Sequence, residues 1–304
     1  MSLIKISQLS KENILLLFNY TKKYIKSPKP NVFIKLMFKD LQLENKILVT
    51  AFFEPSTRTQ LSFESAMLRL GGKVLRFNKE NSSIKKGETF TDTIKTLENY
   101  GDILVIRHSE NGILDTISNI THKPVINGGD GSGEHPTQAL LDLFCIWLKF
   151  GNDFVNKTIV LYGDCSNSRT IASLSKLLDL FNINYYYLAY PGRYKINNYS
   201  NIALEYLKDI NPDVIYCTRM QNERTEGCNI PRDMIINQEF IEKHISNEKI
   251  KNNEFLLLHP LPRNEEIDSS IDKMLYSGYF KAMDYSVYLR SMIICFMLNN
   301  TFDL

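Results

Sequence analysis

The segment 52–59, Phe-Phe-Glu-Pro-Ser-Thr-Arg-Thr, constrains this chain more than any other stretch. It follows the apolar segment 46–53, which is rich in Ile, Leu, Val and Phe and is typical of a buried strand. Beyond the proline, apolar residues recur at helical spacing as far as Gly71-Gly72, which favours a helix end. The sequence therefore predicts a strand, a tight turn and a helix whose N-terminus carries several hydroxyl groups.

Such an N-terminus favours an anion, because its unpaired N–H groups and the helix dipole both attract negative charge. Ser56, Thr57 and Thr59 supply the hydroxyls, and Arg58 adds a planar guanidinium suited to phosphate. The same residues also fit an ordinary helix cap with one surface arginine. The motif alone leaves both interpretations open.

Length and charge limit the classes of protein that this chain can represent. A chain of 304 residues with 43% hydrophobic content is typical of two ordinary domains. The formal net charge of +2 argues against nucleic acid or a membrane surface as the main partner. Any anion site must then be a local concentration of arginine and lysine.

Cysteine usage and apolar runs predict the compartment. The five cysteines are scattered and contain no C-x-x-C pair, which favours reduced thiols over disulfides or a zinc site. The apolar run 14–18 is too short for a secretion signal, and 292–298 falls short of the ~20 residues that span a bilayer. We expect a soluble, cytoplasmic protein without a membrane partner or a bound metal.

Strand-like and helix-like segments alternate for most of the length. Strands are predicted at 46–53, 73–77, 103–107, 124–126, 158–162, 183–189, 214–217 and 254–258. Helices are predicted between them, notably at 89–99, 136–150 and 169–181, and again at about 286–300. This alternation indicates an α/β fold in which helices cover parallel sheets. Pro136 and Gly151 bracket the helix 136–150, which is predicted to connect two halves.

Chemically capable side chains follow the predicted strands, at the edge of a parallel sheet where ligands bind. Four arginines lie at four strand ends, and each of them alone is typical of a solvated surface: Arg107, Arg169, Arg219 and Arg263. His135 and Gln138 follow a short glycine-rich loop after the fourth strand, and Gln221 follows Arg219 closely. Together with the hydroxyl cluster, these residues indicate one site for a multiply charged anion.

Other catalytic motifs are absent from the sequence. The glycine-rich segment 128–133 does not satisfy G-x-G-x-x-G, and no G-x-x-x-x-G-K-[ST] occurs, which argues against nicotinamide and ATP chemistry. His135 and His259 have no metal-ligand spacing. Because no G-x-S-x-G elbow is present either, direct displacement is favoured over a covalent intermediate.

At this point the motifs are specific enough to show a resemblance. In order and spacing, they resemble the catalytic chains of the aspartate carbamoyltransferases, within the aspartate/ornithine carbamoyltransferase superfamily. The matching segments are 53–59, 82–88, Arg107-His108, 135–138, 218–221 with Glu223-Arg224, and the His-Pro-Leu-Pro-Arg of 259–263. The resemblance runs from the first helix to the last.

The resemblance implies transfer of the carbamoyl group of carbamoyl phosphate to the amino group of L-aspartate, an early step of pyrimidine synthesis, without a cofactor. It implies a homotrimer with shared active sites. It also implies a carbamoyl phosphate-binding domain, 1–134, on which the C-terminal helix 286–304 packs, and an aspartate-binding domain, 135–285. Whether separate regulatory chains bind the trimer is left open.

The resemblance also implies a role for individual residues. The phosphate is held by Ser56, Thr57, Arg58 and Thr59, and the carbonyl oxygen is polarised by Thr59, Arg107 and His135. The carbamoyl amide is received by Gln138 and the backbone carbonyls of Pro260 and Leu261, with a cis bond expected at Leu261-Pro262. A neighbouring copy donates Lys86 and either Ser82 or Ser83. The aspartate carboxylates are bound by Lys86, Arg169, Arg219 and Gln221, and Glu54 is expected to reach Arg169 and Arg224.

Two local departures and two rival functions remain. Tyr285-Ser286 replaces the Asn-Gly of many relatives, so the turn expected there must differ, and Ser166-Asn167-Ser168 replaces a Lys-x-Gly. Ornithine carbamoyltransferases share the phosphate half of the site, but they use His-Cys-Leu-Pro and a Ser-Met-Gly segment that this chain lacks. A non-catalytic anion-binding subunit of the same fold is the second rival.

Overall fold

Residues 2–39, 41–194, 201–221 and 229–300 are described by the computed structural model of the chain. Contacts between residues divide the chain into two units. Unit 1 comprises Met1–Thr137 with Met283–Leu304, and unit 2 comprises Gln138–Ala282. Both boundaries fall inside helices, α5 (Pro136–Phe150) and α10 (Tyr279–Leu298).

Unit 1 is built on a parallel sheet with the strand order β2-β1-β3-β4. Its strands are β1 (Ile47–Phe52), β2 (Lys73–Asn78), β3 (Ile103–His108) and β4 (Val125–Asp130). The three strands β1, β3 and β4 are buried along most of their length, whereas the edge strand β2 is largely exposed. Continuous apolar runs such as 103–106 are therefore the signature of strands covered on both faces.

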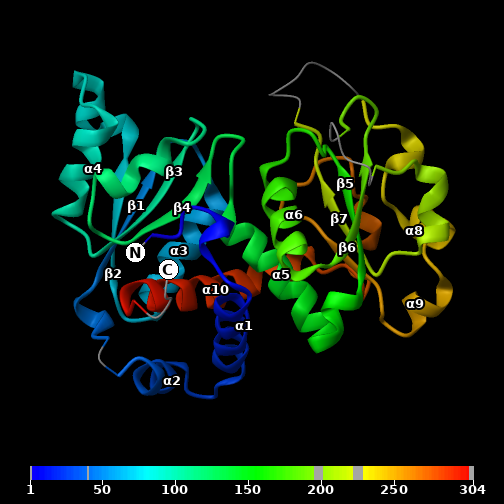
Figure 1. Cartoon of the computed structure of the whole chain (residues 1–304), viewed down its shortest axis with the longest axis horizontal. Helices are drawn as coiled ribbons and strands as arrows, with labels where there is room; N and C mark the ends of the chain where they lie inside the picture. The colour runs from blue at the N-terminus through cyan, green and yellow to red at the C-terminus, as the bar shows by residue number, and fades with distance from the viewer. Residues whose placement is uncertain (1, 40, 195–200, 222–228, 301–304) are drawn as a thin grey trace. The chain divides into compact units, whose positions relative to one another are not determined.

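The helices of unit 1 are α1 (Lys11–Lys26), α2 (Pro30–Met37), α3 (Thr57–Arg69), α4 (Phe90–Glu98) and the C-terminal part of α10. In unit 1, α3 packs against β1 and β2 and α4 packs against β3, whereas α2 lies beside α1, away from the strands (Figure 1). The helix α3 is tied to the sheet by Glu64, whose carboxylate accepts hydrogen bonds from Thr50 of β1 and Arg76 of β2. Phe296 of α10 packs against Tyr20 and Phe38, at ring-centroid distances of 5.3 and 5.6 Å. The C-terminal helix thus contacts the N-terminal unit, as predicted.

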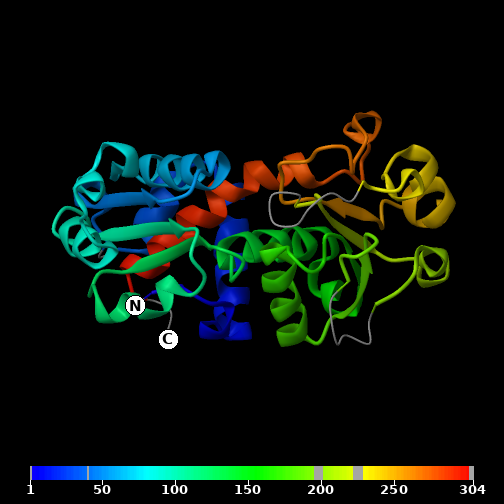
Figure 2. The same ribbon diagram turned by 90° about the horizontal axis from the view of Figure 1, so that it is seen from above.

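Unit 2 repeats the same topology, with the parallel strand order β6-β5-β7-β8. Its strands are β5 (Thr158–Gly163), β6 (Asn184–Ala189), β7 (Val214–Thr218) and β8 (Leu256–Leu258). Its further helices are α6 (Arg169–Phe181), α7 (Leu207–Ile210), α8 (Gln238–His244) and α9 (Asn247–Lys251). Figures 1 and 2 show α6 on one side of this sheet and α8 and α9 on the other. The core between them is apolar, with Tyr162 and Phe240 in edge-to-face contact at 5.8 Å.

The α/β prediction is confirmed, and each of the eight predicted strands is present. One boundary was wrong, because β4 continues through Gly128 and Gly129 to Asp130 instead of ending at 126. Glycine in a sequence is typical of a loop, but here Gly128 allows the backbones of β4 and β3 to approach each other closely. A side chain at Gly128 would place its Cβ 3.2 Å from the carbonyl oxygen of Ile106 in β3.

The predicted start of the final helix, at about 286, was also wrong, and the turn of relatives that was expected to differ at Tyr285-Ser286 is replaced by helix. Both residues lie inside α10, which begins at Tyr279 and not near 286. Neither residue breaks a helix, and the Ser286 hydroxyl donates to the carbonyl oxygen of Met283 within the helix, at 2.6 Å. The final helix is therefore longer than its apolar segment alone indicates.

Four of the five cysteines are described; they are buried and form no disulfide with one another: Cys145, Cys165, Cys217 and Cys295. Cys228 lies outside the described residues. Within the described part of the chain, no helix is both long and apolar enough to cross a membrane.

Candidate active site

Several of the predicted site residues lie at the carboxyl ends of the two central strand pairs, and the others follow the edge strands β2, β4 and β8. In unit 1, β1 pairs with β3, and Phe52 lies opposite Arg107 at the ends of these strands. In unit 2, β5 pairs with β7, and Gly163 lies opposite Thr218. Each pair flanks the point where the strand order reverses, which is the usual ligand position in an open parallel sheet.

The predicted anion-binding turn leads directly into α3. Ser56 is the N-cap residue, with extended backbone, and its side chain makes no capping hydrogen bond. Thr57 and Arg58 are exposed, whereas Thr59 is buried. An ordinary serine cap would accept a hydrogen bond from the first turn of the helix. Because Ser56 does not, the geometry favours the anion-site interpretation over the simple cap.

Arg107 ends the neighbouring strand and is held in place by two groups. Its guanidinium forms an ion pair with Glu54 and donates a hydrogen bond to the carbonyl oxygen of Gly128, at 3.1 Å. Only 9% of Arg107 is exposed. A guanidinium fixed in this way can present positive charge without the entropic cost of ordering a mobile side chain.

His135 lies near the same turn in unit 1. Its Nε2 is 3.5 Å from the Thr59 hydroxyl, and both residues are buried. The loop before it is fixed by two carboxylates that our sequence reasoning missed. Asp130 accepts from the backbone N–H of Glu134, at 2.7 Å, and Glu134 accepts from that of Ile6, at 2.8 Å. The sequence could have indicated these contacts, because Asp130 lies within the glycine-rich segment 128–133 and Glu134 follows it.

The segment predicted to serve a neighbouring copy is exposed. Ser82 donates a hydrogen bond to the carbonyl oxygen of Lys79 within its own loop, at 2.7 Å. Ser83 and Lys86 bound a short 3₁₀ helix that ends at Gly87, whose φ is 92°. Lys86 is exposed, as a residue that acts in another chain would be.

In unit 2, Arg169 and Arg219 follow the paired strands β5 and β7. Arg169 begins α6, and Arg219 donates to the carbonyl oxygen of Met220, at 3.1 Å. Both are half-buried, as is Gln221. Asp164, which the sequence analysis did not single out, is fully buried and accepts from the backbone N–H of Gln221, at 3.0 Å. Glu223 and Arg224 of the matching motif lie outside the described residues, and with them the contact expected between Glu54 and Arg224.

The segment after β8 has an unusual backbone. The Leu261-Pro262 bond is cis, as predicted, and Leu261 has a φ of 57°. The backbone N–H of Leu261 donates to His259 Nδ1, at 2.8 Å, and His259 Nε2 lies 3.0 Å from the Glu266 carboxylate. Burial alone would raise the pKa of Glu266, but its hydrogen bond with His259 holds that pKa below the usual value. A buried pair thus supports the loop that carries the Pro260 and Leu261 carbonyls.

Two further predicted residues, Gln138 and Arg263, each donate a hydrogen bond to a carboxylate. Gln138 lies in the first turn of α5 and donates its side-chain N–H to Asp142, at 3.0 Å. Arg263, the fourth arginine at a strand end, donates to Asp272, at 2.7 Å, and its guanidinium lies over the Tyr279 ring. Because these contacts occupy the Arg263 guanidinium, they favour a structural role for Arg263 over binding of an anion.

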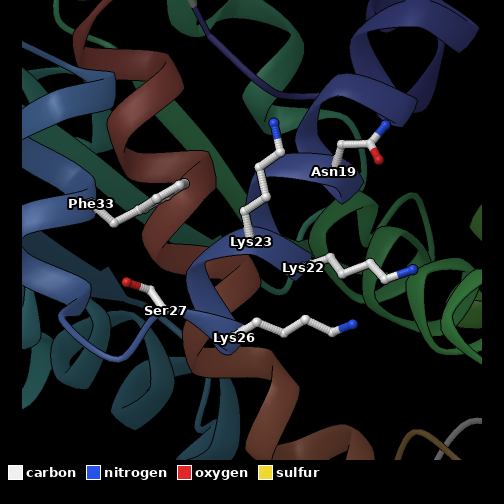
Figure 3. Close-up of a pocket in the computed structure, with 6 residues that line it drawn as sticks. All are labelled: Asn19, Lys22, Lys23, Lys26, Ser27 and Phe33. Carbon is white, nitrogen blue, oxygen red and sulfur yellow. The ribbon is translucent and has the colours of Figure 1, made fainter.

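Another hollow in unit 1 is lined by lysines of α1, but they do not converge. Lys22, Lys23, Lys26 and Phe33 lie around it (Figure 3). The ammonium of Lys23 points away from those of Lys22 and Lys26 (Figure 3). An anion site needs donors that meet at one point, so this hollow is a weaker candidate. No cluster of His, Cys, Asp and Glu that could hold a metal occurs among the residues that the structure describes.

Known proteins match the chain along nearly its whole length. The family model "aspartate/ornithine carbamoyltransferase, carbamoyl-P binding domain" matches residues 1–147, and the model of the Asp/Orn binding domain matches 155–297. The aspartate carbamoyltransferase catalytic subunit of Picrophilus torridus is 38% identical, with 98% of both chains covered. That of Clostridium novyi is 37% identical over 98% of this chain and 97% of its own.

Solved structures agree with this assignment. The catalytic subunit of M. jannaschii aspartate transcarbamoylase is 34% identical, with a TM-score of 0.82 and 98% of both chains covered. Aspartate transcarbamoylase from Trypanosoma cruzi, in complex with N-(phosphonacetyl)-L-aspartic acid, is 31% identical, with a TM-score of 0.79 and 97% and 94% coverage. The chain therefore belongs to the aspartate/ornithine carbamoyltransferase family.

Proposed function

We propose that this protein is an aspartate carbamoyltransferase, which transfers the carbamoyl group of carbamoyl phosphate to the amino group of L-aspartate. The products are N-carbamoyl-L-aspartate and phosphate. The observation that carries the proposal is the pairing of an uncapped α3 N-terminus with the fixed Arg107 guanidinium at adjacent strand ends of unit 1. Full-length relatives with this name support the choice of substrates.

The reaction is direct displacement. The aspartate amine attacks the carbonyl carbon, negative charge develops on the carbonyl oxygen, and the bond to the phosphate oxygen breaks. Such a reaction needs fixed positive donors and close positioning more than it needs a protein nucleophile. In unit 1, Ser56, Thr57, Arg58 and Thr59 bind the phosphate, while Arg107, Thr59 and His135 stabilise the oxygen. No step of this scheme requires a cofactor or a metal.

In unit 2, the remaining residues bind the amide and the acceptor. Gln138 and the carbonyls of Pro260 and Leu261 receive the carbamoyl N–H groups. The carboxylates of aspartate bind Arg169, Arg219 and Gln221, and Lys86 of a neighbouring copy. Unit 1 with α10 accordingly serves as the carbamoyl phosphate-binding domain, unit 2 as the aspartate-binding domain, and α5 as their connecting helix.

We propose a homotrimer with shared active sites as the working form. The apolar side chains Leu61 and Leu68 lie on α3 and are 52% and 60% exposed, and Leu75 on the edge strand β2 is 45% exposed. An exposed group of this kind is typical of an interaction surface. The exposed loop that holds Ser82 and Lys86 follows the same edge strand. Location in the cytoplasm and association with regulatory chains remain predictions.

One experiment tests the substrate assignment directly. Purified protein is mixed with carbamoyl phosphate and either L-aspartate or L-ornithine, and the carbamoylated product and phosphate are quantified. We expect turnover with aspartate and little with ornithine, because Arg169, Arg219 and Gln221 suit a second carboxylate and not an ammonium group. Preferred carbamoylation of ornithine would instead identify an ornithine carbamoyltransferase. Binding of carbamoyl phosphate without turnover would identify a non-catalytic subunit.

A further inference from the structure

The carboxylate of Asp142, in unit 2, accepts hydrogen bonds from the side chains of Gln138 and Tyr216. Its Oδ1 accepts from Gln138 Nε2, at 3.0 Å, and its Oδ2 accepts from the Tyr216 hydroxyl, at 2.8 Å. Gln138 and Asp142 are one helical turn apart on α5, and Tyr216 lies on β7. Only 1% of Asp142 is exposed, so this carboxylate sits in the core while Gln138 is half-buried.

These two contacts determine which end of the Gln138 amide faces Asp142. A carboxylate that receives hydrogen bonds at both oxygens can only accept, so the NH₂ end of the amide must be the end that faces it. Tyr216 remains a donor at neutral pH, because burial and then the nearby Asp142 charge raise the pKa of its hydroxyl well above the usual value. The carbonyl end of Gln138, Oε1, is consequently directed away from Asp142.

We propose that Asp142 is a positioning residue that holds Gln138 Oε1 as a hydrogen-bond acceptor and so selects a carbamoyl group over an acyl group of the same shape. The inference rests on the proposed function and on the role of Gln138 within it. Carbamoyl phosphate offers an NH₂ group where acetyl phosphate offers a methyl group. An acceptor held against a methyl group is left without a partner, and sites built in this way reject such analogues.

The alternative is that Asp142 only ties α5 to β7 in the core. The replacement Asp142→Asn separates the two explanations. Its Oδ1 can still accept from Tyr216, but its NH₂ then faces Gln138, which favours the reversed amide with Oε1 toward residue 142. The substitution therefore keeps the size of the side chain at position 142 and its hydrogen bond with Tyr216 of β7. It reverses the Gln138 amide, so that the NH₂ group of Gln138 is directed away from residue 142.

The experiment measures kcat/KM for carbamoyl phosphate and the inhibition constant of acetyl phosphate in wild type and variants. In Asp142→Asn we expect the preference for carbamoyl phosphate over acetyl phosphate to fall by about tenfold, the cost of one unpaired acceptor. Tyr216→Phe removes only the tie to β7, so it should change this preference by less than about twofold. In a Gln138→Ala background, Asp142→Asn should have no further effect on the preference, because the amide that it turns is gone.

A folded Asp142→Asn variant with wild-type preference for carbamoyl phosphate would overturn the inference. If that variant does not fold, Asp142→Ser replaces it, since a serine hydroxyl can pair with Tyr216 and leaves the Gln138 amide free to turn. A wild-type protein without carbamoyl transfer would refute the proposed function itself. Turnover by the wild type together with an unchanged preference in the variant would refute only the role of Asp142.

Discussion

Arg107, the penultimate residue of β3, forms an ion pair with Glu54, which follows the end of β1 in the same unit. The two side chains are 11% and 22% exposed, so the pair is largely removed from solvent. In the proposed mechanism Arg107 must act on an anionic substrate. Glu54 is then both the support of this guanidinium and a competitor for its charge.

Replacing Glu54 by glutamine separates these two effects. We expect Glu54→Gln to lower the free energy of unfolding by about 1–3 kcal/mol, because the Arg107 charge loses its partner. We also expect inorganic phosphate to raise the Tm more in the variant than in wild type, because the competing carboxylate is gone. Thermal denaturation with and without phosphate measures both quantities. Glu44→Gln, which removes only the exposed pair with Lys35, is the matched control. An unchanged response to phosphate would show that Glu54 does not compete for Arg107.

His135 offers a test of charge stabilisation. We expect His135→Ala to lower kcat for carbamoyl transfer by about 10²–10³-fold, because one donor to the developing oxyanion is lost. The exposed His122 is a suitable control, and His122→Ala should retain wild-type kcat. Steady-state kinetics at saturating aspartate distinguish a loss of kcat from weaker binding. A variant with full kcat and only a raised KM would place His135 in substrate binding alone.

The buried pair of Glu266 and His259 predicts a specific dependence of stability on pH. The pKa of Glu266 in the folded protein is lower than its usual value of 4.5, despite burial, because His259 hydrogen-bonds its carboxylate. Between the pKa of Glu266 in the folded protein and its usual value of 4.5, the native state therefore binds fewer protons than the unfolded state. The free energy of unfolding consequently increases with pH in this interval. The contribution of Glu266 is present above about pH 4.5 and is lost as the pH falls through the lower, folded-state pKa.

Glu266→Gln should remove this contribution. We expect the Tm of the variant to decline less steeply than that of wild type as the pH falls below 4.5. Glu239→Gln, at an exposed carboxylate of α8, serves as the control. Thermal melts across the acidic range provide the comparison. Equal slopes in wild type and Glu266→Gln would mean that the pair does not control acid stability.

The exposed leucines of α3 predict an interface between copies. We expect Leu68→Glu to shift the protein toward monomers, because a charge placed in an apolar contact must be desolvated. Leu275→Glu is a matched control, since Leu275 is 85% exposed and belongs to unit 2. Sedimentation velocity reads out the state of assembly. If Leu68→Glu sediments as wild type does, this face of α3 is not the contact.

The sequence predicted the fold well because its signals are local. The apolar runs of the central strands, the proline that starts α5 and the glycines after α3 each act within a few residues. What it missed depends on distant contacts. Asp164 and Asp142 look like ordinary acidic residues until folding places Gln221 and Tyr216 against them. The spacing of apolar residues along α3 also could not show which of them are buried, and Leu61 is one that is exposed.

The most direct test of the shared site uses two inactive variants. In the proposed trimer, Lys86 serves the neighbouring site, whereas His135 serves its own. We expect Lys86→Ala and His135→Ala to be nearly inactive when each is alone. Every closed trimer that contains both kinds of chain has one site with both residues intact. Dissociating and reassembling an equal mixture should then restore about a quarter of wild-type activity.

The same mixture contains its own control. Mixing the two variants without dissociation should restore nothing, because no hybrid trimers form. If Lys86 acted within its own chain, no site in any hybrid would be intact, since each chain would carry one defective residue. Mixed trimers that remain inactive, although sedimentation and mass spectrometry show that hybrids have formed, would therefore assign Lys86 to its own site and contradict the exchange of residues between copies.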